Sequence, residues 1–214
     1  ADTFMVGILG ETELAAVSMS NSAFFVLSLV IFGIQSGTGV LVAQYYGKGR
    51  LDAINRIMGM GYYVSIGLTA VVALLACLFP MQMMRIVTNN PDLWEPGAEY
   101  ARIVGFSYVC MSFSGVYIAV QRSMENPKLG AILLTVSGAL NILLHYMLIF
   151  GKLGAPAMGC AGAAVATLIS RAFEVVVILG CMLWSKRLPI NPRLMAKQGK
   201  LIAGDFMKYS LPVV

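Results

Sequence analysis

Four ionisable side chains lie within or at the edge of apolar stretches, where a charge is costly unless it faces a polar interior. They are Asp2, His145, Arg171 and Glu174. Surroundings of low dielectric favour the neutral form of both a carboxyl group and an imidazole, so Asp2 and His145 can take up and release protons near neutral pH. Such a pair can act as a proton relay. The simpler alternatives are a packing role for His145 and a helix-end position for Asp2.

Arg171 and Glu174 are three residues apart, which places them on one face of a helix. Opposite charges at this spacing can pair with each other. We therefore expect a structural ion pair here, in the cytoplasmic half of its span, rather than a part of a transport pathway.

Polar residues recur at helical spacing in four apolar stretches, so each stretch presents a polar stripe along one face. The stripes are Asn21, Ser28 and Gln35; Ser107, Ser114 and Gln121; Ser137, Asn141 and His145; and Thr167, Ser170, Arg171 and Glu174. Hydrogen bonds that only hold helices together would explain any single stripe. Four stripes together favour a polar cavity. The residues expected to line this cleft are Asn21, Ser28, Gln35, Ser107, Ser114 and Ser137.

The composition indicates that these stretches are membrane helices. Of the 214 residues, 58% are hydrophobic and 12% are charged, against about 25% charged residues in soluble domains. This balance excludes both a soluble globular domain and a disordered chain. The net charge of +5 does not indicate nucleic-acid binding, because the 15 Lys and Arg lie between apolar runs and form no single basic face.

Motifs for cofactors, nucleotides and metals are missing from the sequence. Each of the four cysteines lies singly in an apolar run, without the spacing of a metal or redox site. We expect all four to be buried and reduced: Cys77, Cys110, Cys160 and Cys181. There is no Walker or G-x-G-x-x-G pattern, so we expect no nucleotide and no cofactor.

A membrane-spanning helix needs about 20 apolar residues, so charge-poor runs mark the spans. The runs are residues 3–9, which look like the end of a truncated first helix, then 14–47, 57–84, 103–121, 129–151 and 159–185. We expect an all-α integral membrane protein with a six-helix bundle over residues 1–190. A cytoplasmic linker over 191–204 and the start of a seventh helix over 205–214 would follow. The chain opens without an initiator Met, which suggests a piece of a longer protein.

The distribution of basic residues predicts the orientation of the spans. Eleven of the 15 Lys and Arg lie in loops assigned to one side, three lie in loops on the other side, and Arg171 lies within a span. The loops after the second, fourth and sixth helices are therefore expected in the cytoplasm. This makes the chain a multi-pass protein of the plasma or inner membrane.

The linker over 191–204 has an amphipathic pattern. Its apolar face carries Leu194, Gln198, Leu201 and Ile202, and its basic face carries Arg193, Lys197 and Lys200. This pattern fits a short helix that lies on the anionic cytoplasmic leaflet. A solvated linker is an equally good interpretation.

Several short segments resemble those of multidrug and toxic compound extrusion (MATE) transporters. They are Asp2–Gly10 (DTFMVGILG), Leu14–Ser18 (LAAVS), Val40–Arg50 (VLVAQYYGKGR), Leu140–Leu144 (LNILL), Ile149–Gly151 (IFG) and Gly162–Thr167 (GAAVAT). The resemblance covers nearly the whole chain. It implies one lobe, the amino-terminal one, of a two-lobe transporter with twelve helices, which exports organic cations or drugs in exchange for protons or sodium ions.

The same resemblance implies roles for four residues in cation coupling: Asp2, Asn141, His145 and Thr167. A sodium ion could be held by Asp2, Asn141 and Thr167. His145 departs from the family, in which the position four residues after the asparagine is often Asp or Asn. A neutral imidazole is a poor ligand for a hard cation and a protonated one repels it, so we expect proton coupling rather than sodium coupling.

Three other functions compete with this one. A flippase for lipid-linked oligosaccharides would share the two-lobe fold but would need more cationic residues in its cleft than Arg171. An intramembrane enzyme could use Asp2 and His145, yet the sequence has a single histidine and no H-E-x-x-H or G-x-S-x-G motif, so we expect no enzyme. A purely structural subunit is the third. The expected partners are small organic cations and the lipid bilayer, with no nucleic acid, and the full-length protein is expected to be a monomer.

Overall fold

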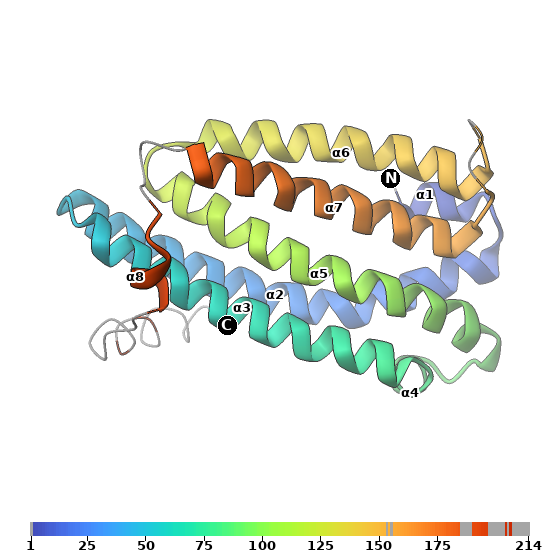
Figure 1. Ribbon diagram of the computed structural model, residues 1–214. Coiled ribbons are helices and arrows are strands. Elements are labelled where there is room, and N and C mark those ends of the chain that lie inside the picture. Colours follow the sequence, from blue (N-terminus) through green and yellow to red (C-terminus); the bar gives the residue numbers. More distant parts are fainter. Residues whose placement is uncertain are drawn as a thin grey trace. The chain divides into compact units, whose positions relative to one another are not determined.

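The computed structural model describes residues 2–152, 154, 156–184, 190–196, 204 and 206, with side chains from Met5 onward (Figure 1). Every regular element within these residues is a helix. The elements are α1 (Asp2–Gly7), α2 (Glu11–Gly47), α3 (Leu51–Leu78), α4 (Pro80–Val87), the 3-10 turn η1 (Pro91–Leu93), α5 (Trp94–Ser123), α6 (Pro127–Phe150), α7 (Gly159–Trp184) and α8 (Pro192–Ala196).

Five of these helical segments are long and apolar enough to cross a membrane. They are α2, α3, η1 with α5, α6 and α7, with lengths from 24 to 37 residues. Large apolar side chains are exposed along them, as expected where lipid replaces water around a helix. The all-α fold class and the five full spans predicted from the sequence are therefore confirmed.

The predicted third span over 57–84 is wrong at its end, because the structure divides this run between α3 and α4. Phe79 between them has φ −130° and ψ 48°, and Pro80 begins α4. Proline has no backbone N–H to donate to the preceding turn, and its ring clashes with the carbonyl group four residues before it. A count of apolar residues does not detect this break, since Pro80 stands among apolar neighbours.

Glycine ends α2. Gly49 has a φ of +67°, which glycine adopts without steric cost. The backbone N–H of Arg50 donates to Tyr45 O at 3.0 Å and that of Gly49 donates to Tyr46 O at 2.9 Å, so two carbonyl groups at the helix end are satisfied. The chain can therefore reverse within three residues and begin α3 at Leu51.

The contacts divide the chain into two compact units, and the long helices contribute to both. The first unit comprises Ala1–Leu27, Thr69–Cys110 and Thr135–Phe173, and the second comprises Ser28–Leu68, Met111–Leu134 and Glu174–Val214.

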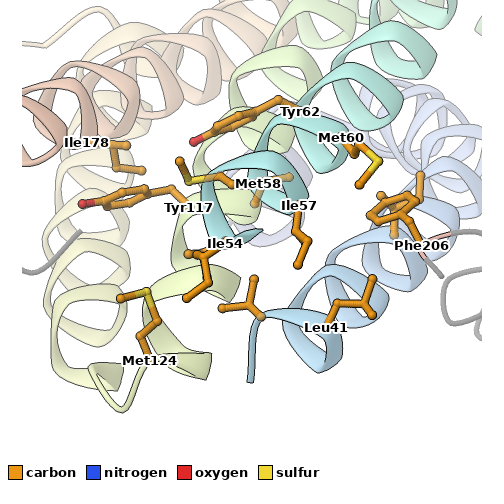
Figure 2. Close-up of a cluster of buried hydrophobic side chains, with 14 of the residues drawn as sticks. Leu41, Ile54, Ile57, Met58, Met60, Tyr62, Tyr117, Met124, Ile178 and Phe206 are labelled. Carbon is orange, nitrogen blue, oxygen red and sulfur yellow. The ribbon is translucent and has the colours of Figure 1, made fainter. Parts of the chain in front are cut away.

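The second unit has a large apolar core (Figure 2). Ile54, Ile57 and Met58 on α3 are fully buried among side chains from the other helices of the unit. The surrounding residues that Figure 2 labels include Leu41 of α2, Tyr117 and Met124 of α5, Ile178 of α7 and Phe206. Because lipid provides no hydrophobic driving force between helices, such close packing is what stabilises the bundle.

The burial of the four cysteines differs from the expectation drawn from the sequence. All four cysteines are free, and Cys160 is buried, but Cys77 is exposed, so the expectation that all four are buried is wrong. A thiol behaves as a small apolar group, so a lipid-facing position on α3 does not penalise it.

Of the linker predicted over 191–204, the structure describes 191–196 and Gly204. Of the seventh helix predicted from 205, it describes Phe206 alone.

Candidate functional site

A histidine and a threonine meet inside the first unit. His145 of α6 is 0% exposed, and its Nε2 lies 3.4 Å from Oγ1 of Thr167 on α7. The hydroxyl group of Thr167 donates to the carbonyl oxygen of Ala163, one turn earlier on α7, at 3.1 Å. Its single proton is thus used within its own helix, and Thr167 Oγ1 can only accept from the imidazole. In the tautomer that carries a proton on Nε2, the imidazole donates to Thr167 Oγ1.

Small residues bring the two helices together at this site. A side-chain carbon at Gly162 of α7 would lie 2.5 Å from the carbonyl oxygen of Leu148 on α6. The same carbonyl group accepts from the backbone N–H of Met158 at 2.9 Å. Glycine is therefore required for this backbone approach, which places Thr167 within reach of His145.

The other two residues expected in cation coupling lie on elements of the same unit. Asn141 is half-buried on α6, one turn before His145. Asp2 begins α1, and its side chain lies outside the described part of the structure. Asn141 and Thr167 offer the side-chain oxygens that a sodium ion would need. The described residues contain no cluster of three or more His, Cys, Asp or Glu that could hold a metal ion.

In the first unit, the predicted cleft-lining residues are Asn21, Ser107 and Ser137. Asn21 is half-buried, and its Oδ1 accepts a hydrogen bond from the Tyr100 hydroxyl group of α5 at 3.1 Å. Ser107 is buried and donates to Val104 O within its own helix at 2.6 Å. Ser137 is also buried. The hydrogen bonds of Asn21 and Ser107 connect or stabilise helices, which is the simpler of the two roles considered for the stripes.

The predicted cleft-lining residues of the second unit are Ser28, Gln35 and Ser114. Ser28 and Gln35 are half-buried, and Ser114 is buried. The carboxamide of Gln35 lies directly against Gly115 of α5, in space that a side chain at position 115 would fill. Gly115 therefore leaves room for a polar group that belongs to one of the predicted stripes.

Arg171 and Glu174 lie one turn apart on α7. Glu174 is 1% exposed, whereas Arg171 is half-buried. A carboxyl group so deeply buried in a membrane helix needs polar or charged neighbours. The ion pair between these two residues stays a prediction.

Aromatic residues of the first unit were not singled out from the sequence, although two of them contact the Asn21 face of α2. Tyr100 binds Asn21, and Tyr108 stacks on Phe24 with ring centroids 4.8 Å apart and planes at 14°. Tyr100 and Tyr108 are eight residues apart, and Asn21 and Phe24 are three apart, so each pair shares a helix face. This spacing was the signal that could have revealed them.

Known proteins match the chain in sequence and in fold. The MatE family model matches residues 1–147. The chain is 30% identical over 171 residues to the probable multidrug resistance protein YoeA of Bacillus subtilis strain 168, a match that covers 80% of this chain and 37% of the relative. It is 31% identical over 174 residues to the probable multidrug resistance protein NorM of Thermotoga maritima, with the same coverage of 80% and 37%.

Solved structures match nearly all of the chain. The inward-facing structure of a multidrug resistance MATE family transporter of the MOP superfamily superposes with a TM-score of 0.88 at 22% identity and covers 99% of this chain and 48% of that one. A MOP superfamily transporter from Pyrococcus furiosus, described as having a binding pocket of reverse polarity, gives 0.86 at 23% identity, with coverage of 99% and 46%. The chain thus spans about half the length of these structures and 37% of the two relatives.

The apolar spans and the all-helical fold define a multi-pass α-helical membrane protein. Within that class, the match over residues 1–147 shows that the chain belongs to the MatE family.

Proposed function

We propose that the full-length protein is an antiporter that exports organic cations or drugs in exchange for a cation. The family and the multidrug resistance names of the relatives support this activity. The two-lobe organisation implied by the resemblance would place a second, similar lobe opposite this one. Alternating exposure of a site between two such lobes is the usual mechanism of secondary transport.

The coupling ion in this proposal is the proton. The observation that carries it is the position of His145, which is fully buried with its Nε2 3.4 Å from Thr167 Oγ1. A sodium ion prefers several oxygen ligands, and an imidazole 3.4 Å from Thr167 Oγ1 competes for one of those oxygens. The same imidazole can bind a second proton.

The proposed mechanism is a shift between two conformations. Deprotonated Asp2 stabilises a conformation that is open to the cationic substrate, and protonated Asp2 favours the other, so a proton gradient biases the equilibrium. His145 would hold or pass on the proton within the same unit, while Asn141 and Thr167 orient the groups around it. A difference in proton affinity between the two conformations is what allows the gradient to drive export.

Efflux measurements in proteoliposomes test the proposal. The full-length protein is reconstituted, loaded with a fluorescent organic cation such as ethidium, and exposed separately to a pH gradient and to a sodium gradient. We expect efflux under the pH gradient and none above background under sodium alone. Replacement Asp2→Asn should abolish the gradient-driven component.

Two results would contradict the proposal in different ways. Efflux driven only by sodium would show that the antiporter activity is right and the ion is wrong. No efflux under either gradient would reject the antiporter, and transport of lipid-linked oligosaccharides would then be measured. Unchanged gradient-driven efflux in Asp2→Asn would remove Asp2 from the mechanism.

A further inference from the structure

Residues 190–196 form a short strap that lies against α3 within the second unit (Figure 1). The strap contains α8, and Asn191 directly precedes this helix. Asn191 organises the strap locally: its Oδ1 accepts from the backbone N–H of Arg193 at 3.1 Å, and its carbonyl oxygen accepts from the N–H groups of Leu194 and Met195. The strap is therefore an ordered element, with its own helix cap, rather than an extended connection.

A hydrogen bond joins the strap to α3. The backbone N–H of Asn191 donates to Oδ1 of Asn55 at 3.1 Å, across 136 positions of sequence. Asn55 is 2% exposed, and its Nδ2 donates to Leu51 O, one turn earlier on α3, at 3.2 Å. Because the amide nitrogen is bound to its own helix, the carboxamide oxygen is held in the orientation that receives the strap.

The second contact lies one turn further along α3, at Gly59. A side-chain carbon at this position would lie 2.8 Å from Cα and 2.9 Å from the carbonyl carbon of Met195 and would also contact its carbonyl oxygen. These are backbone atoms, which cannot move aside without displacing the strap. Asn55 and Gly59 share a helix face, so α3 offers the strap a hydrogen-bond acceptor at Asn55 and a surface without a side chain at Gly59.

Apolar contacts complete the attachment. Ile190 and Met195 pack against the core of the second unit, and with Gly59, Tyr62 and Phe113 they border a cavity of about 320 Å³. Phe206, ten residues beyond α8, is 3% exposed in the same core. The chain that leaves α7 is thus bound to the second unit at the strap and again at Phe206.

We propose that Asn55 and Gly59 form a docking site for the strap, so that residues 190–196 move with this unit. In a two-lobe transporter this segment joins the lobes. A fixed strap would limit the relative movement of the lobes. The docking site is a property of this unit and does not depend on which ion or substrate the protein carries.

Hydrogen exchange of the full-length protein, followed by mass spectrometry of the peptide containing residues 190–196, tests the docking site. Gly59→Leu should unseat the strap and speed exchange of this peptide by at least about tenfold, because its backbone amides lose their packed environment. The matched control is Gly67→Leu, two turns along α3, where nothing lies within 4 Å of an added side-chain carbon. It should leave the exchange unchanged.

A second variant keeps the test decisive if Gly59→Leu does not fold. Asn55→Ala removes the acceptor for Asn191, together with the bond that Nδ2 donates to Leu51 O within α3. It should speed exchange at the Asn191 amide roughly fivefold, as expected for the loss of one hydrogen bond to the strap. Equal exchange in Gly59→Leu and the wild type, or equal acceleration in Gly59→Leu and Gly67→Leu, would overturn the proposal. None of these readouts requires transport, so failure here is distinct from failure of the antiporter.

Discussion

Thr167 has one hydroxyl proton, and that proton goes to the carbonyl oxygen of Ala163. The lone pairs that remain can accept an N–H or bind a cation, and the neighbour at position 145 decides between the two. In this chain the neighbour is an imidazole at 3.4 Å. The chemistry of the site therefore depends on the side chain at position 145.

Replacement His145→Asp should shift the coupling preference toward sodium. A carboxylate next to Thr167, one turn after Asn141, would supply the hard oxygen ligand that the imidazole lacks. We expect sodium-driven efflux to appear and proton-driven efflux to fall by tenfold or more, measured in proteoliposomes with each gradient applied alone.

Replacement His145→Gln distinguishes a proton-carrying role of this side chain from a role in hydrogen bonding alone. Its carboxamide can still donate to Thr167 Oγ1, but it does not titrate. Loss of proton-driven efflux in His145→Gln would support a proton-carrying role, whereas full retention would mean that His145 only packs and donates a hydrogen bond.

Helix ends and helix contacts illustrate what a sequence can and cannot reveal at the scale of elements. Charge-poor runs located the five full spans because a spanning helix must bury an apolar length of fixed size. The break before Pro80 was missed because its neighbours are apolar. The contact between Gly59 and the strap was also missed. The two segments are far apart in the sequence, and no local pattern indicates that they pack together. The sequence and the resemblance put His145 and Thr167 in one set of cation-coupling residues, but no pattern predicted that their side chains meet.

Glu125, at the end of α5, has a φ of +59°, which costs a residue with a side chain about 1 to 2 kcal/mol relative to its usual conformations. The N–H of Asn126 donates to Gln121 O at 2.9 Å across this turn, and this hydrogen bond stabilises the conformation of Glu125 at the helix end. Glu125→Gly should stabilise the protein by about 1 kcal/mol. The measurement is the apparent melting temperature of the purified protein, which we expect to rise.

The matched substitution is Glu125→Ala, which removes the same charge but keeps Cβ. It should give little or no gain. If the alanine variant melts as high as the glycine variant, the effect comes from charge and not from backbone conformation.

Gly162→Ala should separate α6 from α7. The new Cβ would lie 2.5 Å from Leu148 O, a backbone atom, and relief requires the helices to move apart. We expect a loss of roughly 1 to 3 kcal/mol in stability, as for overpacking elsewhere, together with reduced efflux because the contact between His145 and Thr167 lengthens. Melting temperature and proteoliposome efflux measure the two effects.

Gly180→Ala provides the comparison on the same helix, because nothing lies within 4 Å of a Cβ at that position. Alanine has the higher helix propensity, so this variant should be neutral or slightly more stable. Similar losses in both variants would mean that glycine in α7 serves helix flexibility and not the approach to α6.

For the whole molecule, the orientation in the membrane can be argued from charge alone. Eleven of the 15 Lys and Arg fall in loops predicted to be cytoplasmic, and three fall in loops on the other side. Basic residues in short loops resist translocation, so a bias of this size predicts which ends of the spans face the cytoplasm. The turn after α2, with Lys48, and the loop after α6, with Lys152, should therefore lie on opposite sides.

Single cysteines at these two positions test the orientation directly. Both Lys48 and Lys152 are exposed, so a cysteine at either position is accessible from the aqueous phase on its own side. In a full-length background with its native cysteines replaced, a membrane-impermeant maleimide added to intact cells should label Lys152→Cys and should label Lys48→Cys only after the cells are opened. Labelling in the reverse order would show that the predicted orientation is wrong. The pH gradient would then act on His145 from the opposite direction. In the coupling scheme, the proton would enter from the side of the membrane on which the turn between α2 and α3 lies.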